Sequence, residues 1–280
     1  MEIINAHVHI IEVDKIKEKE KYLNFLKEIP SFSNIDQVLN ILSPEAVLKQ
    51  MEEAKIKKCV ILACYAPIIY ASNEFVAEVC KKFPEKFIGF ASVNPHDEEA
   101  PQKLERAIKN LGLSGLKLHP PLQNFYPHEK KYWPIYEKAE ELNIPVIFHV
   151  GSTPFGSLVK LSQANPLLID EIAINFPNLK IILTHLGTLW HNETFMVAEK
   201  NPNVYIDTSC YPYEMENLLN EELIKRVGED KFIFGTDFPM PYQGKLHSMK
   251  EYVDCINKLN IPSWIKEKIF YKNFENLMKK

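Results

Sequence analysis

The chain has 280 residues, 46% hydrophobic and 25% charged, with a formal net charge of −4. This is ordinary globular composition, with enough apolar residues for a sizeable core. The mild acidity and the lack of a basic tract argue against nucleic-acid binding. No run approaches the roughly 18 apolar residues of a membrane span, and no secretory leader is visible. We therefore expect a cytoplasmic protein that acts on a small molecule, with a homo-oligomer left open.

Short apolar runs alternate with amphipathic segments along the chain, a pattern typical of a parallel sheet covered by helices. Eight strands are predicted, at 2–9, 58–64, 86–93, 115–119, 145–149, 180–185, 203–207 and 231–236. Predicted helices include 44–57, 73–83, 98–111, 132–142, 213–227 and a closing helix at 262–280. Because no glycine-rich phosphate loop follows any strand, the pattern favours one α/β domain, a (β/α)8 TIM barrel over residues 1–280, rather than a doubly wound sheet.

One connection, at about residues 10–43, is much longer than the others. Its first half is charged and helix-like, and its second half is polar with a few apolar residues. Loops of this length inside compact domains are usually lids or binding loops. We expect this insertion to lie as a cap over the C-terminal mouth of the barrel; a peripheral or oligomer-forming arm is the alternative.

Histidines gather at the ends of the predicted strands. In a (β/α)8 barrel these ends converge on one mouth, where active sites lie. Two of the histidines are separated by a single residue, so strand periodicity places both on one face as half of a transition-metal site. A third imidazole and a carboxylate would complete a shell of nitrogen and oxygen with a place for water. The strand-end residues are His7, His9, His119, His149 and His185, with Asp237 just past the eighth strand.

The run from residue 4 to residue 9 (INAHVH) resembles the opening signature of the amidohydrolase superfamily. Four further pieces are similar to its amidohydrolase-related branch of metal-dependent hydrolases and decarboxylases: 115–120 (GLKLHP), 148–151 (FHVG), 184–187 (THLG) and 234–239 (FGTDFP). The resemblance implies one divalent ion, Zn²⁺ with Mn²⁺ as the alternative. It implies that the ion is bound by His7, His9, His149 and Asp237, and that His185 is an acid–base group near the substrate.

The reaction is predicted to be hydrolysis of a small carbonyl substrate by metal-activated water, with Asp237 or His185 moving the proton. Non-oxidative decarboxylation of a small carboxylic acid on the same site is the alternative. It usually needs a cationic partner for the carboxylate, and the two arginines, Arg106 and Arg226, both fall in predicted outer helices.

Lys117 and His119 share a face of the fourth strand, so both are candidates to line the pocket and bind substrate, and Lys117 could replace an arginine. In binuclear members of the superfamily a fourth-strand lysine is carboxylated and bridges two ions, so a second ion is a further alternative. A barrel that binds a small molecule without catalysis is the remaining one.

Overall fold

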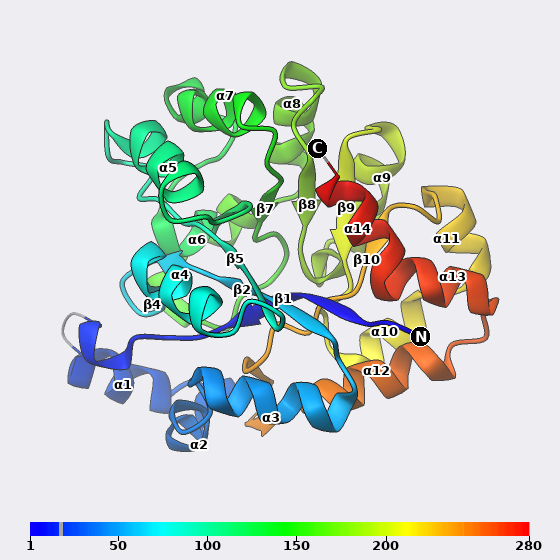
Figure 1. Ribbon diagram of the computed structural model, residues 1–280, viewed down its shortest axis with the longest axis horizontal. Helices are drawn as coiled ribbons and strands as arrows, with labels where there is room; N and C mark the ends of the chain where they lie inside the picture. Colours follow the sequence, from blue (N-terminus) through cyan, green and yellow to red (C-terminus); the bar gives the residue numbers. More distant parts are fainter. Residues whose placement is uncertain (17–18, 243, 280) are drawn as a thin grey trace.

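A computed structural model describes residues 1–16, 19–242 and 244–279 (Figure 1). Within these residues eight parallel strands follow one another around a barrel, as predicted. Two arcs, β1–β2–β5 and β6–β7–β8–β9–β10, make up the sheet. The strands are β1 (Ile4–His9), β2 (Lys58–Leu62), β5 (Phe87–Phe90), β6 (Leu116–Leu118), β7 (Val146–Phe148), β8 (Ile181–Leu183), β9 (Val204–Asp207) and β10 (Phe232–Ile233).

Backbone hydrogen bonds join the two arcs into a closed barrel. Between β5 and β6, the amide of Lys117 donates to the carbonyl of Ala91 at 2.7 Å. Between β1 and the segment after β10, the amide of His9 donates to the carbonyl of Phe238 at 2.8 Å. The amide of Asp237 donates to the carbonyl of His7 at 3.0 Å. The barrel is therefore closed at the place where His7 and His9 of the first strand meet Asp237, which follows the last.

Helices cover the outside of the barrel. Helix α3 begins after Ser43 and α4 after Ser72, and each serine hydroxyl accepts a backbone N–H at 3.2 Å, as helix-capping residues do. The helices are α3 (Pro44–Ala54), α4 (Asn73–Lys82), α5 (Ala100–Lys109), α7 (Trp133–Glu141), α8 (Leu167–Asn175), α9 (His191–Lys200), α10 (Pro212–Leu218), α11 (Glu221–Val227), α12 (Met249–Lys258), α13 (Ser263–Glu267) and α14 (Asn273–Met278). No helix in the described part of the chain is long and apolar enough to cross a membrane.

The single helix predicted at 213–227 is wrong, because two helices, α10 and α11, occupy this stretch. Leu219 leaves the helical conformation with ψ at 113°, and the side chain of Asn220 accepts the amide of Leu223 at 2.9 Å to start α11. The helix start at Asn220 lies inside a continuous amphipathic pattern, where hydrophobic periodicity does not register it.

The first strand contains an irregularity next to the mouth. Its register against β2 shifts between Asn5 and Val8. Below the shift, Ile4 packs with the apolar residues inside the barrel, whereas Val8 packs in the layer between strands and helices. β-Bulges re-aim side chains beside active sites. Here the shift lets the strand keep its apolar packing on both sides while both of its histidines face the mouth.

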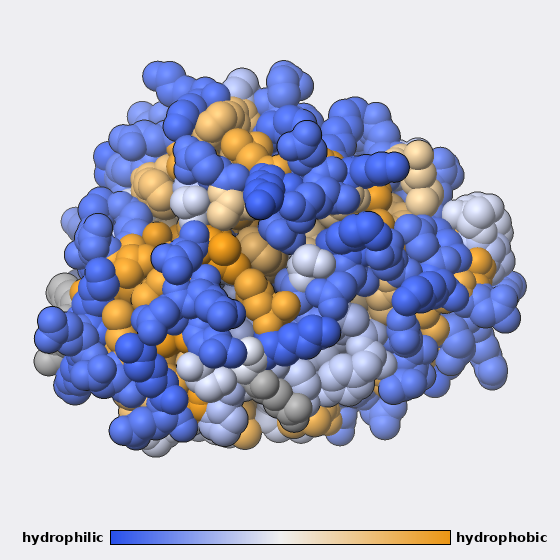
Figure 2. All heavy atoms as spheres, turned by 90° about the horizontal axis from the view of Figure 1, so that it is seen from below, coloured by the Kyte–Doolittle hydropathy of each residue, from blue (hydrophilic) through white to orange (hydrophobic). Residues whose placement is uncertain are grey.

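The insertion at 10–43 contains α1 (Lys19–Lys27) and α2 (Ile35–Leu39), drawn beside α3 in Figure 1. Its apolar side chains form a cluster separate from the barrel core, including Leu26, Phe32 and Val38. The cluster also contains Ile69 and Phe155, from loops that follow β2 and β7. The insertion thus packs on loops at the C-terminal ends of the strands. Seen from below, the side of α1, α2 and α3, hydrophobic residues show between hydrophilic ones on this face (Figure 2).

Candidate metal centre

One pocket at the C-terminal ends of the strands contains every site residue predicted from the sequence. All of these side chains are buried except Asp237, whose side chain is 16% exposed. The residues that line the pocket include His7, His9, Lys117, His119, His149, His185 and Asp237. The side chains at the strand ends therefore meet in one pocket, as the predicted barrel requires.

Three acceptor atoms lie at the corners of a small triangle. His7 Nε2 and His9 Nε2 are 3.2 Å apart, and Asp237 Oδ1 lies 3.2 Å from the first and 3.1 Å from the second. Ligands at about 2.1 Å from one ion stand about 3.0 Å apart at right angles and about 3.4 Å apart at tetrahedral angles. The observed separations fall between these values. The three side chains can therefore share one cation.

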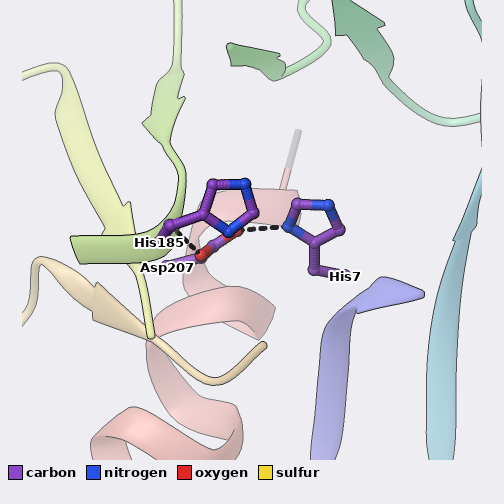
Figure 3. Close-up of side chains that lie close together, drawn as sticks. All are labelled: His7, His185 and Asp207. Carbon is purple, nitrogen blue, oxygen red and sulfur yellow. Dashed lines mark hydrogen bonds and ion pairs between the residues drawn. The ribbon is translucent and has the colours of Figure 1, made fainter. Parts of the chain in front are cut away.

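Asp207, at the end of β9, lies between His7 and His185 and is hydrogen-bonded to both residues (Figure 3). Its Oδ2 accepts from His7 Nδ1 at 2.7 Å, and its Oδ1 accepts the backbone N–H of His185 at 2.8 Å. The hydroxyl of Ser209 donates a short hydrogen bond to the same Oδ1. When His7 is neutral and uses its one ring proton at Nδ1 on Asp207, its Nε2 is an acceptor inside the triangle. A carboxylate behind a histidine fixes ligand tautomers in this way in metal sites.

The hydrogen-bond chain continues from Ser209 to His149. The hydroxyl proton of Ser209 is committed to Asp207, so Ser209 Oγ accepts from His185 Nδ1 at 2.8 Å. His185 Nε2 is then an acceptor, and the ring nitrogen within reach is His149 Nδ1 at 3.0 Å. This assigns the proton of His149 to Nδ1 and leaves its Nε2 as a bare acceptor. That Nε2 is buried and makes no hydrogen bond to the described residues.

The structure brings together three of the four ligands implied by the family resemblance. His149 lines the pocket, yet it does not join the groups of described residues whose ligand atoms all lie within 4.8 Å of one another. Its role as fourth ligand stays a prediction. A second such group, His7 with His185 and Asp207, is explained by the hydrogen bonds around Asp207.

Asp207 and Ser209 were missed in reading the sequence. Asp207 ends a predicted strand, so the rule that selected the histidines also covered it. Both ring nitrogens of His185 have a partner, Ser209 and His149. Its role as an acid–base group stays a prediction.

Two residues of the fourth strand face the same pocket. Lys117 is fully buried, and its Nζ lies 3.4 Å from His7 Nε2. The ring of His119 stacks on that of His149 with centroids 3.8 Å apart, and its Nδ1 accepts the amide of Leu122 at 3.2 Å. The ring proton of neutral His119 is therefore on Nε2. The expectation that Lys117 and His119 line the pocket is met in the structure.

Burial and neighbouring charges shift the pKa of Asp237 in opposite directions, and burial lowers the pKa of several histidines of the site. Burial would raise the pKa of Asp237, but the charges of His7 and His185 and hydrogen bonds from His7 and His9 hold it well below its usual value. Burial lowers the pKa of His185 to about 4 and those of His119 and His149 well below the usual value. His7 differs, because burial and the charge of Lys117 lower its pKa but Asp207 and Asp237 raise it further, so that its pKa lies above the usual value. Ionised carboxylates and neutral His119, His149 and His185 are thus favoured before any ion is present, and an ion bound by His7 must displace a proton from it.

Backbone strain is concentrated at the same residues. Asp237, His185 and Leu186 have φ values of 53°, 63° and 49°, in the left-handed region that L-residues rarely adopt. Such conformations cost about 1–3 kcal/mol each and persist where the surroundings fix them. The amide of Asp237 is bonded to the carbonyl of His7, and that of His185 to Asp207. The barrel thus holds two functional side chains in orientations that a relaxed backbone would not give.

Comparisons with known proteins fit this architecture. The chain belongs to the amidohydrolase family, whose model matches residues 34–277. It is 26% identical over 254 residues to a gamma-resorcylate decarboxylase from Polaromonas sp. (strain JS666 / ATCC BAA-500), covering 74% of this chain and 75% of that protein. It is 28% identical over 231 residues to a 2-keto-4-carboxy-3-hexenedioate hydratase from Sphingobium sp. (strain NBRC 103272 / SYK-6), covering 68% of this chain and 66% of the relative.

The fold is shared with solved structures. A dihydroxybenzoic acid decarboxylase from Polaromonas sp. JS666, solved with bound manganese and the inhibitor 2-nitroresorcinol, superposes with a TM-score of 0.73 at 20% identity. The alignment covers 99% of this chain and 96% of that one. The family membership supports an enzyme, and the relatives described above are decarboxylases and a hydratase. The expected hydrolysis finds no support in these relatives, which favour the alternative, decarboxylation.

We expect Asp207→Asn to weaken divalent-metal binding by roughly 10–100-fold, the usual cost of losing a carboxylate behind a ligand histidine. The amide can donate to His7 Nδ1 and so reverse its tautomer. Mn²⁺ titration by calorimetry measures the effect, and circular dichroism checks the fold. Asp170→Asn on α8, an ion-paired carboxylate outside the pocket, is the matched control. Equal affinity for the two variants would contradict the tautomer assignment.

The metal-free protein should lose stability as the pH falls from about 6.5 toward 4. The unfolded chain takes up a proton on His185 near pH 6.5, whereas the folded chain does so only near pH 4. Each such histidine contributes roughly 1 kcal/mol per pH unit within this window. Urea unfolding of chelated protein at pH 7.0, 6.0 and 5.0 measures the dependence. His119→Gln should flatten it, and an unchanged slope in that variant would contradict the buried, neutral state of His119.

Proposed function

We propose that the protein is a metal-dependent, non-oxidative decarboxylase of a small carboxylic acid. His7, His9 and Asp237 would hold the ion, and the unpartnered Nε2 of His149 is the proposed fourth ligand. The donor set, imidazole nitrogens with one carboxylate, suits either Mn²⁺ or Zn²⁺. We favour Mn²⁺ because the decarboxylase of similar fold contains manganese. When bound, the ion supplies Lewis-acid attachment for the carboxylate and a neighbouring oxygen of the substrate.

The observation that carries this proposal is the buried amino group of Lys117, whose pKa is lowered by burial although Asp237 and Asp207 act to raise it. Among the described residues no carboxylate oxygen lies within 4.0 Å of its Nζ, so the described part of the chain gives it no ion-pair partner. A buried cation without an anion is costly, and a substrate carboxylate beside the ion removes that cost. Arg106 and Arg226 cannot serve, because they pair with Glu74 on α4 and Glu199 on α9 outside the barrel.

The remaining donors of the pocket suit the other oxygens of such a substrate. His119 presents an N–H at Nε2, since its Nδ1 accepts from the backbone. Asp237 uses Oδ1 toward His7 and His9, and we assign its Oδ2 to proton transfer. The low pKa of Asp237 keeps it a carboxylate at rest. It must therefore first accept a proton from solvent water, which it then delivers to the carbon that loses CO2. In the overall reaction the carboxylate anion and one proton give CO2 and a product that carries hydrogen in place of the carboxylate.

The direct test is CO2 release from 2,6-dihydroxybenzoate by Mn²⁺-loaded protein, with loss of activity in a chelator and recovery when Mn²⁺ is restored. In D2O the product should carry deuterium at the carbon that bore the carboxylate. Ester, lactone and amide hydrolysis are measured in parallel, because turnover there without CO2 release would restore the hydrolase interpretation. Hydration of unsaturated keto acids without CO2 release would instead align the protein with its hydratase relative.

We expect Lys117→Met to reduce kcat/KM for decarboxylation by at least about 100-fold, because the carboxylate loses a charge-assisted contact in a buried site. Metal content and melting temperature should stay near those of the wild type, as Lys117 is not a proposed ligand. Lys109→Met, which removes an exposed lysine on α5, is the matched control. A Lys117→Met enzyme with full activity would remove the main support for the proposal.

A further inference from the structure

A second cavity adjoins the metal-side pocket. It encloses about 50 Å³ between the insertion and the barrel mouth. Its walls include Leu26, Phe32 and Val38 from the insertion, and among the described residues that line it only His9 carries a polar side chain. We call it the insertion cavity. Since an apolar cavity offers water no hydrogen-bond partners, it favours an apolar occupant.

The insertion cavity shares part of its wall with the pocket of the metal centre. His9, Ile69, Phe155 and Met240 line both spaces. His9 Nε2 is one corner of the acceptor triangle, so a ligand seated at the triangle lies beside the apolar walls. The other side of the pocket is polar, with Ser152, Thr153, Thr188 and Ser209 in its lining. The hydroxyl oxygen of Thr153 is buried and has no partner in the described part of the chain.

We infer that the acid taken by this site carries a short, unbranched apolar substituent that enters the insertion cavity, while its carboxylate and adjacent oxygen lie on the polar side. This inference rests on the proposed function for the identity of the polar head. A space of about 10–15 Å³ holds one water-sized group. The 50 Å³ of the insertion cavity therefore accommodate about three or four carbon atoms.

The inference predicts how affinity changes with chain length. Each methylene removed from water contributes about 0.8 kcal/mol, which is about fourfold in affinity. The probes are straight-chain 2-hydroxy acids from 2-hydroxypropanoate to 2-hydroxyoctanoate, titrated calorimetrically into Mn²⁺-loaded protein. Affinity should rise about fourfold per carbon over the first three or four added carbons and then level off. An affinity that stays flat or falls along the series would overturn the inference.

Variants locate the effect in the insertion cavity. Val38→Phe fills the cavity and should abolish the rise while leaving the affinity for 2-hydroxypropanoate within about twofold of wild type. Val13→Phe makes the same change in the insertion at a residue that packs against the cluster outside the cavity, and it should keep the rise. Leu26→Ala enlarges the cavity and should extend the rise to longer acids. It provides the test if Val38→Phe does not fold.

The binding series and the turnover assay can fail separately. A normal chain-length dependence of binding with no CO2 release from 2,6-dihydroxybenzoate would refute decarboxylation and leave the apolar subsite standing. CO2 release from 2,6-dihydroxybenzoate with no chain-length dependence would refute the subsite alone. A chain-length dependence that Val38→Phe does not change would assign the apolar contact to another part of the pocket and also refute the inference.

Discussion

The buried carboxylate of Asp207 determines the chemistry that the rest of the site can perform. It accepts from His7, from the backbone of His185 and from Ser209, and through them it orients His149. One charge thereby fixes the tautomers of three imidazoles. An imidazole with the opposite tautomer would present a proton where a cation must bind. The ligand geometry is thus set by a residue that lies outside the acceptor triangle.

The barrel supplies the rigidity that this arrangement needs. Strained backbone at Asp237 and His185 is held by hydrogen bonds to strand residues, and the register shift in β1 keeps both of its histidines on the inner side of the mouth. The insertion adds a different property, since its apolar cluster packs on the loops that rim the pocket. The barrel therefore provides the polar chemistry, and the insertion provides the apolar boundary of the same space.

Much of the fold was predictable, because the strands are apolar runs with a strong period and are separated by amphipathic helices. The residues of the pocket were predictable for the same reason: strand ends converge. What the sequence could not supply is tertiary in origin. Tertiary contacts decide three features that the sequence did not predict. These are the division of the helix at 213–227, the hydrogen-bond partners of His185, and the hydrogen bonds that Asp207 accepts. The comparisons favour the alternative reaction over the predicted hydrolysis; the sequence shows that both arginines fall in predicted outer helices, but not that Lys117 is buried in the pocket.

The acceptor triangle spans the seam of the barrel. His7 and His9 come from the first strand, and Asp237 follows the last. A cation bound there would link the first and last strands at the point where a few backbone hydrogen bonds close the barrel. During synthesis the third corner emerges only after all seven intervening strands. All three ligands would then be present only once the whole barrel has been synthesised, and an incomplete barrel would lack Asp237 and bind the ion less tightly.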